Sequence, residues 1–214
     1  MRGRSDRRSP AADASVVHFP APTKLPVVLH QFQRADNAAV LLAVPAGDLL
    51  SDLPRTYAMR IAGRILLDRL ITEFRRNEGA TYTPKGNTVL SEVFPEYGYA
   101  YVYAETTPDK VDRFYEVAGK ITDDLRTVDI SSDELLRAKE GIIGELEQKR
   151  QRNNHWLSQL SAIQADTRYI EFLRGVRNGY DNVTAQSVRA IAETYFTPEK
   201  FWKFEVLPAS AALR

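Results

Sequence analysis

The sequence predicts an α+β fold: a single domain with a mixed, mostly antiparallel sheet and helices packed on one face. Stretches typical of strands cluster in the first half of the chain, helical patterns follow in series, and a strand pattern returns at the end. This order is typical of α+β domains, whereas a parallel sheet needs strands and helices in alternation. A chain of 214 residues, 43% hydrophobic and 27% charged, is long enough for one such core.

The first two predicted strands are residues 27–32 (VVLHQF) and 37–45 (NAAVLLAVP). The second is apolar enough to be buried on both faces. A helix then follows, because Asp52 or Ser51 can cap its start and Pro54 stands in its first turn. Its apolar residues recur at helical spacing, which predicts that it lies against the sheet: Leu67, Leu70, Ile71 and Phe74.

Two more strands are predicted at residues 87–94 and 97–106. The second alternates between small residues and tyrosines, so its two faces differ. Small residues let helices approach closely, while the tyrosines give the other face apolar area with polar tips. The stripe of tyrosines is either a peptide-binding surface or a face covered in part by the chain's own helices, and we favour the covered face. The stripe consists of Tyr97, Tyr99, Tyr101 and Tyr103.

The rest of the chain predicts four helices, a loop and a closing strand. The clearest helix start is Ser131 with Glu134 three positions later, which is a capping-box pattern. In order, the elements are helices over 109–126, from Ser131 through Leu146, from a cap at Asn153 or Asn154 through Ile163, and from Thr184 through Tyr195, with a loop at 174–182 and a strand at 200–208.

We expect three segments: an unstructured lead of residues 1–22, a domain over 23–208 and a tail of 209–214. The first eight residues carry a formal charge of +3, which leaves −2 for the rest because the whole chain is +1. The body therefore lacks the basic field that attracts nucleic acid. The arginines of the lead fit an organelle transit peptide or a simple tail, and we favour the tail. No apolar run approaches membrane-spanning length, so we expect no membrane insertion.

The sequence contains no motif typical of a metal site or of a catalytic nucleophile. The chain has no cysteine, and its histidines, His18, His30 and His155, are far apart with no zinc-helix motif among them. Serine-nucleophile elbows and glycine-rich phosphate or dinucleotide loops are absent from the sequence. We therefore predict no metal ligand and no cofactor in this chain.

The stretch RRNEGATYTP, residues 75–84, follows the apolar part of the first long helix. Each residue has a structural explanation. Cations favour a helix C-terminus, Gly79 suits a left-handed cap, and Tyr82 can begin a strand. Taken singly, these residues do not indicate a function.

Several segments taken in order resemble the pitrilysin/insulinase family of zinc peptidases, which includes the mitochondrial processing peptidases and the core proteins of the cytochrome bc1 complex. The resemblance covers about residues 23–208. The segments that carry it are LITEFRRNEGATYTP, FPEYGYAYVYAETTPDKVD, ISSDELLRAKEGII, NNHWLSQL and VTAQSVRAIAETYFTPEKFWKFEVLP.

In this family, two homologous halves enclose a chamber. One half carries zinc on an H-x-x-E-H helix, with the glutamate as general base, and this chain resembles the metal-free half. The resemblance implies a homologous zinc-bearing partner, zinc in that partner, and a peptide or unfolded polypeptide as substrate. It also implies that this chain alone is inactive.

The family's metal-free half presents an arginine, and a tyrosine seven positions later, to the zinc site of the partner. Arg75 and Tyr82 stand at that spacing with Gly79 between them, so the resemblance implies catalytic roles for both. The family often has an acidic residue directly after the arginine, and this chain has Arg76 at that position. Which of the two arginines faces the chamber is therefore left open. The alternatives are a non-catalytic scaffold or assembly subunit of the same fold, and a free-standing peptide-binding module.

Overall fold

The structure is a computed structural model that describes residues 17–32, 36–78 and 84–209. Within them, five strands form one sheet in the order β1-β5-β2-β4-β3. Only the β1–β5 pair is parallel, and the other neighbours are antiparallel. The mixed, mostly antiparallel sheet is therefore confirmed. The strands are β1 (Val27–Gln31), β2 (Ala38–Pro45), β3 (Lys85–Leu90), β4 (Gly98–Thr106) and β5 (Trp202–Pro208).

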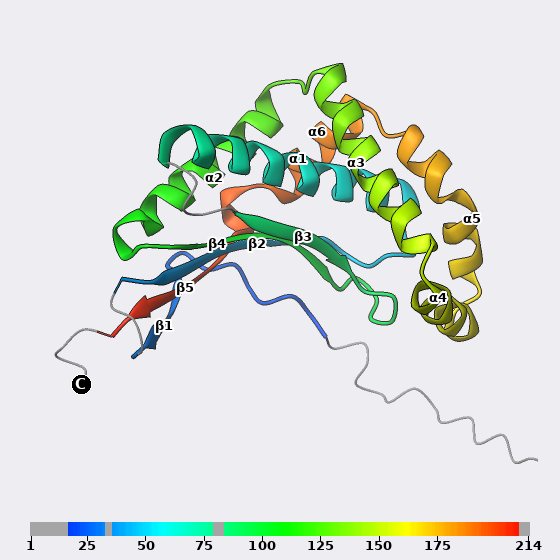
Figure 1. Ribbon diagram of the computed structural model, residues 1–214, viewed down its shortest axis with the longest axis horizontal. Coiled ribbons are helices and arrows are strands. Elements are labelled where there is room, and N and C mark those ends of the chain that lie inside the picture. The colour runs from blue at the N-terminus through cyan, green and yellow to red at the C-terminus, as the bar shows by residue number, and fades with distance from the viewer. Residues whose placement is uncertain (1–16, 33–35, 79–83, 210–214) are drawn as a thin grey trace, which may run out of the picture.

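The helices lie together on one face of the sheet (Figure 1). The long helix α1 contacts strands β3 and β4, and α2, α3, α5 and α6 pack around it. This arrangement confirms the single α+β domain. The helices are α1 (Leu53–Glu78), α2 (Val111–Thr127), α3 (Ser132–Arg150), α4 (Asn153–Ala165), α5 (Arg168–Asp181) and α6 (Ala185–Tyr195), with 3-10 turns η2 (Pro108–Lys110) and η3 (Pro198–Lys200).

The core fills the space between the sheet and these helices. Strand β4 buries its small residues toward the helices, and its tyrosines point to the opposite face, where they are half-exposed. At Gly98 a Cβ atom would lie 2.0 Å from the carbonyl oxygen of Gly47, so this close approach of two backbones requires glycine. The largest fully buried side chains include Ile61, Ile65 and Leu70 of α1, Phe114 of α2 and Tyr180 of α5.

The predicted helix starts are partly correct. Asp52 Oδ1 accepts a hydrogen bond from the backbone N–H of Arg55 at 3.0 Å. Ser131 Oγ accepts from Glu134 N at 3.2 Å, but the Glu134 carboxylate binds Arg69 at 2.7 and 2.9 Å and does not close the capping box. The predicted asparagine cap of α4 is wrong, because the helix begins at Asn153 without a side-chain cap.

Two element predictions are wrong. Strand β3 ends at Leu90, short of the predicted residue 94. Residues 174–182, predicted as a loop, belong almost entirely to helix α5. Val176 and Tyr180 are buried one turn apart, and a Cβ atom on Gly179 would lie 2.1 Å from the ring of Tyr57. Glycine in this helix therefore makes room for an aromatic ring of α1.

Candidate functional site

The predicted catalytic residues lie at the connection between α1 and β3. Arg75 belongs to the last turn of α1, but its side chain is not among those described, and Gly79 and Tyr82 lie outside the described residues. A pairing of Arg75 with Tyr82 therefore stays a prediction. The two ends of this connection are Glu78, where α1 ends, and Lys85, where β3 begins.

The connection enters the sheet at its edge. Strand β3 is the last in the sheet order, and its first residue, Lys85, is paired in register with Tyr103 of β4. The Lys85 ammonium lies 5.9 Å from the centre of the Tyr103 ring. Strand β3 thus begins at the Tyr103 end of the tyrosine row.

Tyr97, just before β4, and the tyrosines of β4 form a continuous row on the sheet face opposite the buried small residues, and the ribbon shows the helices on the other face (Figure 1). Neighbouring rings from Tyr97 to Tyr103 have centroids 5.9 to 6.2 Å apart. The helices lie on the opposite face, so the expectation that they cover the tyrosines is wrong. Phe19, from the segment before β1, stacks on Tyr99 with ring centroids 5.9 Å apart and contacts one end of the row.

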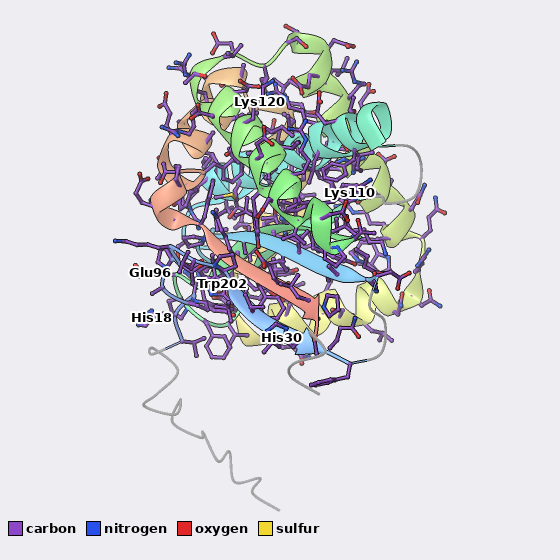
Figure 2. The ribbon with its side chains drawn as sticks, turned by 90° about the vertical axis from the view of Figure 1, so that its left-hand side faces the viewer. His18, His30, Glu96, Lys110, Lys120 and Trp202 are labelled. Carbon is purple, nitrogen blue, oxygen red and sulfur yellow. The ribbon has the colours of Figure 1, made fainter. Side chains whose placement is uncertain are left out.

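Strand β5 extends this aromatic surface. Trp202, labelled in Figure 2, stacks on Phe204 with their ring centroids 5.6 Å apart. Both rings are half-exposed. Leu41 of β2 is in register with Tyr103 on one side and with Phe204 on the other, so the surface crosses three strands. We call the side chains of Tyr97, Tyr99, Tyr101, Tyr103, Trp202 and Phe204 the aromatic face.

The sequence singles out four of the six residues of the aromatic face. The tyrosines stand out because they alternate along one strand. Trp202 and Phe204 also alternate within the predicted strand 200–208, and that alternation was the available signal. That β4 and β5 flank the same strand, β2, could not be inferred from the sequence, because the two strands are about a hundred residues apart in the chain.

The described residues do not supply a ligand set for zinc. His30 lies on β1 and His18 in the segment before it, at separate positions in Figure 2, while His155 belongs to α4. Within the described ranges, no three side chains of histidine, cysteine, aspartate or glutamate come together as metal ligands would.

The family model described as the peptidase M16 inactive domain matches residues 6–142, more than half of the sequence, and the chain belongs to this family. The resemblance to the pitrilysin/insulinase peptidases is thereby confirmed. None of the curated proteins matches the sequence.

Several solved structures share the fold. The peptidase M16 inactive domain from Pseudomonas fluorescens has a TM-score of 0.70 and 17% identity, over 92% of this chain and 47% of that one. The ferredoxin protease FusC, solved as a mutant in complex with Arabidopsis ferredoxin, has a TM-score of 0.64 and 15% identity over 86% and 20%. A chain of complex III2 from Candida albicans, with Inz-5 bound, has a TM-score of 0.68 and 16% identity, over 85% of this chain and 45% of that one.

The chain spans about half, or less, of the length of these three chains. In the described part of the chain, every helix is too short or too polar to cross a lipid bilayer.

Proposed function

We propose that this chain is the metal-free half of a zinc endopeptidase and that it encloses peptides together with a homologous zinc-bearing half. Membership of the peptidase M16 inactive-domain family supports this proposal. The aromatic face carries it, because six half-exposed rings are left uncovered by the helices of this chain.

The aromatic face suits an extended polypeptide. Its rings offer apolar area to side chains of any sequence, and the tyrosine hydroxyls can exchange hydrogen bonds with the peptide backbone. Such contacts select an unfolded segment by its accessibility more than by its sequence. FusC, which shares the fold, is a protease that was solved together with a protein, ferredoxin. The proposed substrate class is therefore peptides or unfolded segments of proteins.

Arg75 and Tyr82 are the proposed contributors to chemistry. Hydrolysis of a peptide at zinc builds negative charge on the former carbonyl oxygen, and a donor aimed at that oxygen stabilises the transition state by several kcal/mol. The Tyr82 hydroxyl can donate without carrying a charge, and the planar guanidinium of Arg75 can hold a substrate carbonyl or orient the hydroxyl. Zinc and its general base belong to the partner half.

A non-catalytic assembly subunit is the second candidate. The likeness to a chain of complex III2 from Candida albicans favours it, because an uncovered aromatic face serves equally well as an interface between subunits. The two candidates differ in what accompanies this chain. A zinc endopeptidase requires an H-x-x-E-H helix in the adjoining polypeptide or in a neighbouring gene, and an assembly subunit does not.

Reconstitution tests the proposal. The chain and the neighbouring zinc-bearing half are purified separately and assayed on a quenched fluorescent peptide, alone and mixed. We expect no turnover from this chain, little from the zinc half, and zinc-dependent turnover from the mixture that saturates at one to one. A stable complex without turnover would favour the assembly subunit, and full activity of the zinc half alone would reject the proposal.

A further inference from the structure

A pocket lies between the helices and strand β3, away from the aromatic face. It has a volume of about 440 Å³ and is bounded by α1, α3, α4, α5 and the helix-facing side of β3. Thr88 of β3 faces the helices, because its hydroxyl lies 2.5 Å from the position that a Cβ atom on Gly63 of α1 would take. A space of this size accommodates one or two amino-acid residues. We call it the Arg60 pocket.

Arg60 gives the pocket a positive charge. Its Nη1 donates a hydrogen bond to the Tyr180 hydroxyl at 3.2 Å, and its guanidinium carbon lies 5.7 Å from the centre of the Phe172 ring. Both partners are uncharged. Among the residues that the structure describes, no carboxylate lies within ion-pair distance of Arg60.

Arg64, one turn further along α1, lines the same pocket and provides an internal comparison. Its guanidinium binds Asp68 at 3.0 Å and Glu145 at 2.7 Å. Within the described part of the chain, the charge of Arg64 is therefore balanced and that of Arg60 is not. A half-buried guanidinium without an anion has donors left to offer, and carboxylates fit its planar fork best.

Nearly half of the side chains that line the pocket are polar or charged, among them Asn87, Glu145 and Gln159, but those next to Arg60 include several apolar ones. Phe172, Val176 and Tyr180 are 5%, 3% and 1% exposed, and Leu146 and Leu173 also line the space. A hydrated inorganic anion gains nothing from such walls, whereas an apolar group gains from leaving water. Lys149 also lines the pocket.

We infer that the Arg60 pocket binds a carboxylate attached to an apolar body, as found in the C-terminal residue of a peptide or in an acidic side chain beside apolar ones. Arg60 holds the carboxylate, the Tyr180 hydroxyl supports the guanidinium, and the apolar walls hold the body. This site goes beyond the proposed function, because it needs neither zinc nor a partner half.

The test is a calorimetric or NMR titration of the full chain with N-acetylphenylalanine and, separately, with its amide. We expect the acid to bind with a dissociation constant of about 1 mM and the amide at least about ten-fold more weakly, because only the acid pairs with the guanidinium. This comparison needs no variant. Equal binding of acid and amide would overturn the inference.

Variants locate the site. Arg60→Gln is expected to weaken binding of the acid about ten-fold and to leave the amide unchanged. Arg60→Lys retains the charge without the two-pronged donor, so its affinity for the acid should lie between those of the unmodified chain and Arg60→Gln. Arg174→Gln removes an arginine of α5 that is 75% exposed and lies outside the pocket, and it should bind like the unmodified chain. An equal loss in Arg174→Gln would place the binding elsewhere.

Two further ligands separate the sources of the carboxylate. N-acetylglutamate α-amide presents only a side-chain carboxylate, and tighter binding of N-acetylphenylalanine than of this compound would assign the pocket to peptide C-termini. Tighter binding of the glutamate compound would assign it to acidic side chains. Inorganic phosphate should bind more weakly than either, and phosphate binding as tight as that of the acids would contradict the role of the apolar walls. None of these results depends on peptidase activity, so the two proposals can fail separately.

Discussion

The carboxylate of Asp48 accepts a hydrogen bond from the backbone N–H of Glu96 at 2.8 Å, across 48 positions of the chain. It also accepts from the backbone N–H groups of Leu50 and Ser51. Burial by itself would raise the pKa of Asp48, but these hydrogen bonds outweigh burial and lower the pKa to about 2. Asp48 thus joins the loop before α1 to the turn before β4, at the Tyr97 end of the aromatic face.

We predict that Asp48→Asn lowers the free energy of unfolding by about 2 kcal/mol at pH 7, since a carboxylate that accepts several hydrogen bonds is replaced by an amide with one acceptor. Because the pKa of the folded state is depressed, this stabilisation is complete above about pH 4 and is lost as the pH falls toward 2. Urea unfolding at pH 7 and at about pH 2.5 should therefore show a difference from the unmodified chain that shrinks in acid. Asp123→Asn, which changes an exposed aspartate, is the control, and an equal effect there would contradict the account.

We predict opposite outcomes for two glycines of α5. Gly179→Ala places a Cβ atom 2.1 Å from the Tyr57 ring and should destabilise the chain by about 1–3 kcal/mol. Gly175→Ala meets no atom within 4 Å and should stabilise it by about 0.5–1 kcal/mol, because alanine favours a helix. Thermal or urea unfolding of both variants measures the contrast. Equal effects would mean that Tyr57 does not occupy the position over Gly179.

The segment that contains these two glycines is one that the sequence did not predict correctly. Glycines and asparagine in residues 174–182 are typical of a loop. In the structure the segment is helical, and Gly179 leaves room there for the ring of Tyr57, which comes from a distant part of the chain. Local propensity cannot report a contact of this kind. The two faces of β4 were predictable, in contrast, because alternation is a property of one strand.

The candidate site likewise contains some residues that the sequence predicts and others that only the fold brings together. Arg75 and Tyr82 came from the resemblance to a family, and no local pattern singled them out. Four of the six residues of the aromatic face were predictable, whereas Trp202 and Phe204 reach the same face, one strand away from the tyrosines, only through the sheet order β5-β2-β4. The Arg60 pocket takes its walls from five elements. No single stretch of sequence contains it.

We predict a pH-dependent effect for Glu205→Gln. Glu205 is only 7% exposed, and burial is the main cause that raises its pKa. A carboxyl group whose folded-state pKa is raised stabilises the fold below its unfolded pKa and loses that contribution as the pH rises through the folded value. Glu205→Gln should therefore match the unmodified chain near about pH 4 and exceed its unfolding free energy at about pH 8. Glu147→Gln, at an exposed position, should show no such trend, and a constant difference for Glu205→Gln would refute the explanation.

We predict that the aromatic face contributes to substrate binding in the complex with a zinc-bearing half. The double variant Tyr101→Ser, Trp202→Ser should raise KM about ten-fold and change kcat less, because apolar contacts to the peptide persist through the reaction. Tyr195→Ser, on α6 and therefore on the helical side, is the matched control. An unchanged KM in the double variant would exclude the aromatic face from the chamber.

The most direct test of the central claim is kcat for Tyr82→Phe in the complex with the zinc-bearing half. Removing one hydroxyl should leave stability and assembly unchanged, while kcat falls on the order of 100-fold, as expected for the loss of one donor to the oxyanion. Arg75→Lys should also lower kcat, and Arg76→Lys should leave it nearly unchanged. If Tyr82→Phe turns over peptide at the unmodified rate, this half supplies chamber wall alone and takes no part in the chemistry.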